Sequence, residues 1–94
     1  MLYYNQLNLK YMAEKEIGKV VHYFTNLSVA VIAATANLQV GDRIHIKGPK
    51  TDFEQVVDSL QVEKQPVDIL SAGSEAGLKT VEHVKEGDQV YLVE

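Results

Sequence analysis

The sequence predicts an all-β domain, built as a small closed barrel of six strands. Two Gly-Asp pairs, Gly41-Asp42 and Gly87-Asp88, each precede a run of alternating apolar and polar residues. A Gly-Asp pair followed by such a run is typical of a tight turn that leads into a half-buried strand. A third glycine-containing segment, Ala72–Lys79, lies between them. Three such units in so short a chain favour a barrel.

The chain has 94 residues, which is the size of one domain. Hydrophobic residues make up 46% and charged residues 23% of the sequence, as is ordinary for a globular protein. There is no cysteine, which excludes disulfides, thiolate nucleophiles and cysteine metal sites and fits a reducing compartment. The net charge of −4 argues against general nucleic-acid binding, although a local basic patch stays open.

We expect a cytoplasmic protein that does not contact membranes. The first residues, Met1–Gln6, lack the basic region and apolar run of a secretion signal. The longest apolar run, Val29–Ala34, is far shorter than the ~18 residues of a membrane span and suits a buried strand.

Residues 1–13 are predicted to be an N-terminal extension, and residues 14–94 the barrel domain. The extension is too apolar for a free tail, since it holds Leu2, Leu7, Leu9, Met12 and three tyrosines. We expect it to pack on the barrel of its own chain, as an added strand or clamp. Dimerisation through it is the alternative, so a monomer is predicted rather than a dimer.

The barrel strands follow from patterns of apolar residues and turn residues. Gly18 lies inside the first strand and predicts a bend or a close approach of strands there. In the third strand, Ile44 and Ile46 are expected to point inward and Arg43, His45 and Lys47 outward. The six expected strands are Glu14–Phe24, Ser28–Thr35, Arg43–Lys47, Val56–Val62, Glu75–Val81 and Gln89–Val93.

Two segments between these strands are harder to interpret. Residues 52–60 carry apolar residues at helical spacing, and Asp52 with Gln55 could form a capping box, so local signals favour a helix. We nevertheless predict the strand Val56–Val62, with a β-bulge near Asp58, because valines are concentrated there. Val67–Ser71 is predicted to form one helical turn closed by Gly73.

Several of these segments together resemble the β-barrel that follows the GTPase domain in translation factors such as elongation factor Tu. The resembling segments are Ile17–Val20, Leu38–Asp42, Val57–Gln61, Ala72–Lys79 and Gly87-Asp88. His22–Phe24 and Asp52–Val57 are more similar to two relatives of that barrel. One relative is a stand-alone translation-factor-like protein, and the other is the barrel appended to collagenase-like bacterial peptidases.

The resemblance implies a Greek-key-like closed barrel of the translation-protein type, with a strand at Val56–Val62. It implies no GTPase activity, because the GTPase domain is absent. Related barrels contact aminoacyl-tRNA or ribosomal RNA, which implies that RNA is a candidate partner of this chain.

No residue pattern in the sequence predicts catalysis, a cofactor or a metal. Gly48-Pro49-Lys50-Thr51 lacks the spacing of a phosphate-binding loop and has a proline without an amide hydrogen, so no nucleotide is expected. Ser74 is not at the centre of a nucleophile elbow. The histidines His22, His45 and His83 fall on separate strands or turns without zinc-motif spacing, and the carboxylates Asp52, Glu54, Asp58 and Glu63 are expected to be solvated.

A small basic stripe is the sequence's candidate for RNA or partner binding. Arg43, His45 and Lys47 share one face of the third strand, Lys50 lies in the following loop, and Tyr23 is expected nearby. Small barrels bind RNA with such faces, although an ordinary solvated face has the same composition.

We therefore expect a non-enzymatic binding module that contacts RNA, the ribosome or a translation-related protein. The alternative is an accessory barrel that acts with a separately encoded collagenase-like peptidase or RNA-modifying partner. A small-molecule enzyme is the third class, and the missing catalytic set argues against it.

Overall fold

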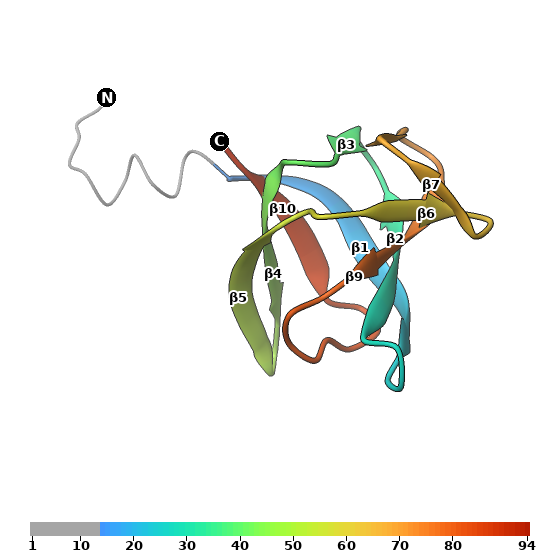
Figure 1. The fold of residues 1–94 in the computed structure, drawn as a ribbon. Coiled ribbons are helices and arrows are strands. Elements are labelled where there is room, and N and C mark those ends of the chain that lie inside the picture. Colours follow the sequence, from blue (N-terminus) through green and yellow to red (C-terminus); the bar gives the residue numbers. More distant parts are fainter. Residues whose placement is uncertain (1–13) are drawn as a thin grey trace, which may run out of the picture.

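The computed structural model describes residues 14–94, which form an all-β domain (Figure 1). This confirms the predicted class, but the number of strands is ten within the described residues, and the predicted six was wrong. Short additional strands account for most of the difference. The strands are β1 Glu14–Phe24, β2 Val29–Ala34, β3 Leu38–Gln39, β4 Arg43–Gly48, β5 Thr51–Val56, β6 Leu60–Val62, β7 Gln65–Val67, β8 Ile69–Leu70, β9 Glu75–Lys79 and β10 Gln89–Val93.

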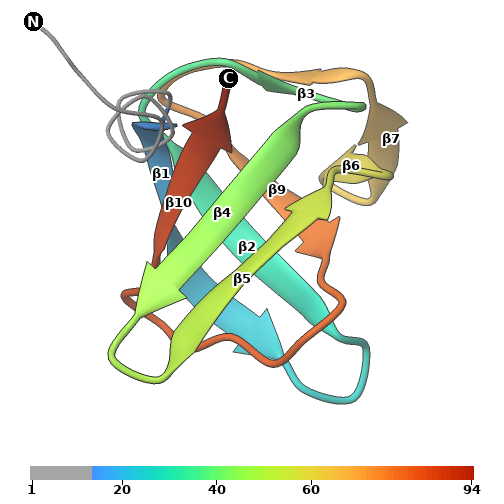
Figure 2. The same cartoon turned by 90° about the vertical axis from the view of Figure 1, so that its left-hand side faces the viewer.

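Eight strands form one antiparallel sheet in the order β5-β4-β10-β1-β2-β9-β6-β7 (Figure 2). β3 and β8 form a separate two-stranded sheet. The predicted closed barrel is wrong, because within residues 14–94 no ladder joins β5 to the other end of the sheet. A side chain joins β5 to the end of β9 instead. The Gln55 amide of β5 donates to the Lys79 carbonyl and accepts from the Val81 amide, both at 2.9 Å.

The strands curl around one hydrophobic core. Ile44 and Ile46 in β4 are fully buried, Arg43 and Lys47 on either side of them are exposed, and His45 between them is partly buried. This confirms the predicted inward face of Ile44 and Ile46 and the outward face of Arg43 and Lys47. Other fully buried side chains come from most of the remaining strands and connections and include Ile17, Val20, Ile32, Leu38, Val57, Leu60, Leu70, Leu78, Val84 and Val90.

The same turn occurs three times, at Gln39–Asp42, Ser71–Ser74 and Lys85–Asp88. In each turn the fourth residue's amide donates to the first residue's carbonyl at 3.1 Å. The third residue is glycine in each, with φ of +98°, +90° and +93°. Such φ values favour glycine, as in position three of a type II turn.

Each of these turns is also tied to a buried residue by two backbone hydrogen bonds. The glycine amide donates to the carbonyl of that residue, whose own amide donates to the carbonyl of the residue after the glycine. The buried partners are Val57, Ala34 and Val20, respectively. The glycine turns therefore hold the sheet together at three places rather than only reversing the chain.

Gly18 lies where β1 is irregular, as the sequence predicts. The pairing with β10 shifts between Glu16 and Gly18. A Cβ atom on Gly18 would lie 2.8 Å from the Ala33 carbonyl oxygen of β2, too close for a real contact. The glycine therefore permits the bend of β1 and the close approach of β2.

The predicted strand Val56–Val62 and the alternative helix over residues 52–60 are both wrong. The chain instead forms β5, leaves the sheet after Val56, and re-enters it as β6 at Leu60. Val57 is the reason, because both of its backbone groups bond to the Gly41-Asp42 turn. The bulge predicted near Asp58 is thus a break between two strands.

The predicted helical turn at Val67–Ser71 is also wrong. β7 ends at Val67, and β8 pairs with β3, so that Leu38 lies opposite Leu70. Burial of both leucines makes this pairing favourable. Pro66 is tolerated because β7 is an edge strand, where a missing amide donor costs little.

The predicted N-terminal extension, residues 1–13, lies outside the described residues, and so does the prediction that it packs on the barrel. Within residues 14–94 there is no helix with the length and hydropathy that a membrane span requires.

Candidate functional site

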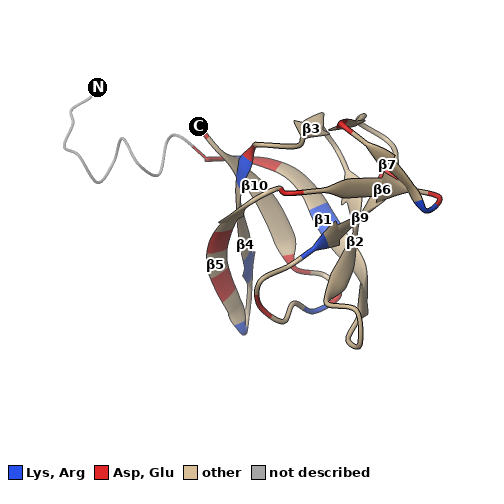
Figure 3. Cartoon of the chain, in the orientation of Figure 1, with Lys and Arg blue, Asp and Glu red and all other residues tan. Residues whose placement is uncertain are grey.

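The predicted basic stripe is interleaved with carboxylates from the neighbouring strand. In the β4–β5 hairpin, His45 lies opposite Glu54 and Lys47 opposite Asp52. Arg43 lies 3.8 Å from the Glu54 carboxylate. Figure 3 shows acidic positions along β5 beside the basic positions of β4. The positive charge of the stripe is therefore largely balanced in place, which weakens the electrostatic basis for RNA binding.

The other two candidates of the stripe lie apart from its centre. Lys50 is exposed in the turn between β4 and β5. Tyr23 lies near the end of β1, where it pairs with Ala30 of β2 and its ring centroid is 4.7 Å from that of His83. Arg43, His45 and Lys47 lie on one strand as predicted, whereas the contacts of Tyr23 are with β2 and His83. RNA or partner binding by these residues stays a prediction.

His45 lies between two carboxylates from different strands. Its Nδ1 is 2.8 Å from Glu14 Oε2 of β1, and its Nε2 is 2.5 Å from Asp52 Oδ1 of β5. The His45 and Glu14 side chains are only 14% and 15% exposed. The doubly protonated imidazolium fits both contacts, because each nitrogen then donates to a carboxylate.

These carboxylates shift the protonation of the imidazole. Partial burial disfavours the charged ring, but the hydrogen bonds to Asp52 and Glu14, together with their charges, outweigh it and raise the His45 pKa above its usual 6.5. In return, the hydrogen bond from His45 lowers the Asp52 pKa below its usual 3.8.

The raised pKa of His45 predicts that the stability of the fold depends on pH. Because the folded pKa is raised above the unfolded value, the stabilisation is complete below about pH 6.5 and is lost as the pH rises through the folded pKa. The groups facing the ring are Glu14, Asp52, Glu54 and the Tyr91 ring, with Arg43 and Lys47 on its own strand.

We expect chemical denaturation in a chelating buffer to show stability falling as the pH rises above about 6.5. His45→Gln should remove this fall. His22→Gln is the matched control, because His22 contacts a single exposed carboxylate, Glu86, at 3.1 Å. The His22→Gln variant should still lose stability as the pH rises. A His45→Gln variant with an unchanged pH profile would contradict the assignment.

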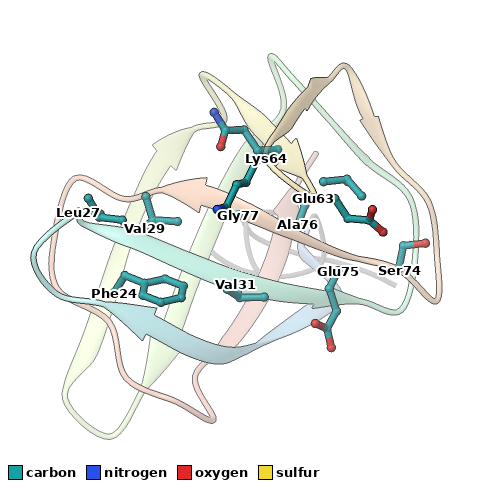
Figure 4. Close-up of a pocket in the computed structure, with 12 residues that line it drawn as sticks. Phe24, Leu27, Val29, Val31, Glu63, Lys64, Ser74, Glu75, Ala76 and Gly77 are labelled. Atoms are coloured by element: carbon teal, nitrogen blue, oxygen red, sulfur yellow. The ribbon is translucent and has the colours of Figure 1, made fainter.

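An apolar groove lies on the outer face of β2 and β9. Val29, Val31 and Gly77 form its floor, and its volume is about 710 Å³ (Figure 4). Phe24 and Leu27 form one wall and are 46% and 63% exposed. The opposite wall comes from the β6–β7 hairpin, which contributes Gln61, Val62, Glu63 and Lys64. No pattern in the sequence predicts this groove.

Positive φ values at non-glycine residues occur in the turns at the rim of the groove. Within residues 14–94, the non-glycine residues with positive φ are Ser28, Glu63 and Lys64, at +55°, +50° and +67°. Ser28 lies between two lining residues, and the other two are lining residues themselves. Glu63 and Lys64 are the two central residues of the β6–β7 hairpin, because Val62 pairs with Gln65. A two-residue hairpin turn of this kind requires positive φ at both central positions, so the turn geometry accounts for these values.

The comparisons with known proteins point to peptidases. The chain is 42% identical over 79 residues to the uncharacterized protease MJ0090 of Methanocaldococcus jannaschii. That match covers 83% of this chain but only 19% of the protease, so the chain spans about a fifth of its relative. No family model matches the chain.

The fold is that of a known C-terminal domain. The crystal structure of the C-terminal domain of a Geobacillus thermoleovorans protein assigned to the U32 peptidases superposes with a TM-score of 0.78 at 17% identity, over 83% of this chain and 91% of that one. Its selenomethionine variant gives a TM-score of 0.77 at 18% identity, over 81% and 96%. These matches support the resemblance to a peptidase-appended barrel and do not support the resemblance to translational GTPases.

Proposed function

We propose that this chain is a non-catalytic accessory domain that binds a peptidase of the U32 type. The observation that carries the proposal is the 42% identity to a segment of a protease, over 83% of this chain. The C-terminal position of the same fold in the Geobacillus thermoleovorans protein agrees with an accessory role. This is the sequence-based alternative, an accessory barrel beside a peptidase, in preference to the RNA-binding or ribosome-binding module.

The groove is the surface that we assign to this contact, with the peptidase as its occupant. Phe24 and Leu27 stand exposed on its wall, and large exposed apolar side chains of this kind mark protein contacts. The charged turn of Glu63 and Lys64 forms the opposite rim. Apolar centres with charged rims are the usual anatomy of protein interfaces.

The chemistry of the side chains supports a non-catalytic role. The chain has no cysteine nucleophile. Within residues 14–94 the side-chain hydrogen bonds of histidine go to carboxylates, and none joins a serine or threonine hydroxyl to a histidine base. Peptide hydrolysis is therefore assigned to the partner.

The proposal predicts selective capture of the peptidase from cells of the source organism. The full chain, tagged and treated with ribonuclease, should retain a U32-type peptidase identified by mass spectrometry. Phe24→Asp combined with Leu27→Asp should lower the recovery at least tenfold, because two charges would be buried in an apolar contact.

Ile69→Asp is the control, since Ile69 is a comparably exposed apolar residue, 54% exposed, outside the groove. It should bind as the unchanged chain does. Loss of capture on ribonuclease treatment, or equal capture by the groove variant, would contradict the proposal.

A further inference from the structure

Three metal-ligating side chains from three strands meet at the outer end of the sheet. Glu14 of β1, His45 of β4 and Glu54 of β5 each place one ligand atom so that all three atoms lie within 4.8 Å of one another. The imidazole and the first carboxylate are largely buried, at 14% and 15% exposure. The group combines nitrogen and oxygen donors, unlike a solvated run of acidic residues.

The geometry points to a binding site for a divalent transition metal such as Zn²⁺, with Glu14, His45 and Glu54 as ligands. Ligand atoms around a tetrahedral zinc are separated by about 3.3 Å, as follows from bonds of about 2.0–2.1 Å. The Nδ1–Oε2 separation of 2.8 Å between His45 and Glu14 already approaches this value. Glu54 lies directly opposite His45 in the hairpin, and its ligand atom is within 4.8 Å of the other two.

Asp52 supplies an independent argument. Its carboxylate holds the other ring nitrogen, Nε2, at 2.5 Å. Metal-binding histidines almost always donate their second ring N–H to a carboxylate, carbonyl or water, which fixes the tautomer and the ring orientation. Asp52 thus presents Nδ1 as the free donor once Glu14 turns to the metal.

The donor set also indicates which metals fit. One imidazole and two carboxylates suit zinc and its neighbours among the first-row metals, whereas Mg²⁺ and Ca²⁺ prefer oxygen alone. Three protein ligands leave one position for water or for a group from a partner. Arg43, 3.8 Å from Glu54, would give up this ion pair when the metal binds.

A bound metal would tie the first residue of β1 to the β4–β5 hairpin, through ligands 31 or more residues apart in sequence. A metal that binds the folded chain but not the unfolded chain raises the melting temperature. This inference does not depend on the proposed peptidase contact, because the two groups of residues do not overlap.

The test uses the full chain with any affinity tag removed and is read by calorimetric titration and by melting temperature. Zn²⁺ should bind with one-to-one stoichiometry and raise the melting temperature, and Mg²⁺ at the same concentration should do neither. Every histidine and carboxylate side chain of the sequence lies within residues 14–94, so no such side chain from the extension can supply the site.

Variants locate the site. His45→Gln, Glu14→Gln and Glu54→Gln should each weaken zinc binding at least tenfold, and Asp52→Asn should weaken it about 10–100-fold through the ring orientation. His22→Gln with Glu86→Gln is the matched control, because it removes the other His–carboxylate pair, and it should bind zinc as the unchanged chain does. Variant melting curves without metal verify that each chain folds. Absence of zinc binding by the unchanged chain, or undiminished binding by His45→Gln, would overturn the inference.

Discussion

Replacing Ile44 by alanine should lower the free energy of unfolding by about 2–4 kcal/mol. Ile44 is fully buried in β4, the strand that links β5 to β10 in the main sheet. Removing three methyl or methylene groups from such a position forfeits their burial and leaves a cavity that the surrounding strands fill only in part.

Chemical denaturation of the two chains measures this loss directly. Lys47→Ala is the control, because it truncates an exposed side chain on the same strand and should change stability by less than about 0.5 kcal/mol. A loss of less than half a kcal/mol for Ile44→Ala would mean that the faces of β4 are assigned the wrong way round.

Gly73→Val should also destabilise the domain, by about 1–3 kcal/mol. A Cβ on Gly73 would meet no atom within 4 Å, so the cost comes from the backbone, whose φ of +90° is disfavoured for a β-branched residue. Gly41 and Gly87 occupy the same position in the other two turns, and the same loss is expected there.

The neighbouring residue provides a control within the same turn. Ala72→Val changes the second turn position, which valine already occupies in the first turn as Val40. Thermal unfolding should separate the pair clearly, with Ala72→Val close to the unchanged chain. Equal melting temperatures for the two variants would show that the turn conformation does not require glycine.

Local signals were sufficient where a residue's conformation depends on its near neighbours. The alternation in β4 and the glycines of the Gly-Asp turns were predicted from the sequence and are confirmed. The inward or outward direction of a side chain in a strand follows from the alternation of neighbouring residues. The need for glycine in a turn follows from the positive φ of that one residue. Both are therefore local properties.

Prediction failed where distant segments decide the structure. Val57 ends β5 by bonding to a turn 15 residues earlier, and Leu70 is drawn into β8 by pairing with Leu38. The failure of the sheet to close is likewise decided by segments far apart in the sequence. The Gln55 side chain of β5 bonds to the backbone of Lys79 and Val81, but no ladder joins β5 to the other end of the sheet within residues 14–94.

The candidate sites were missed for the same reason. His45 was predicted to face outward, but its partners Glu14 and Asp52 become visible only when β1 and β5 are placed beside β4. The pairing of β4 with β5 would have placed Asp52 and Glu54 beside the basic residues of β4. The helical spacing of apolar residues over residues 52–60 obscured this pairing in the sequence. The groove has walls from hairpins more than 30 residues apart, which no local pattern reveals.

The most direct test of the peptidase contact is photo-crosslinking in cells of the source organism. A photoreactive amino acid replaces Leu27 on the groove wall, or Lys47 on the outer face of β4 as a control. We expect the chain substituted at Leu27 to form a covalent adduct with a U32-type peptidase, and the chain substituted at Lys47 to form none. Adducts of the Leu27 position with RNA or ribosomal proteins, or peptidase adducts from Lys47 alone, would contradict the account.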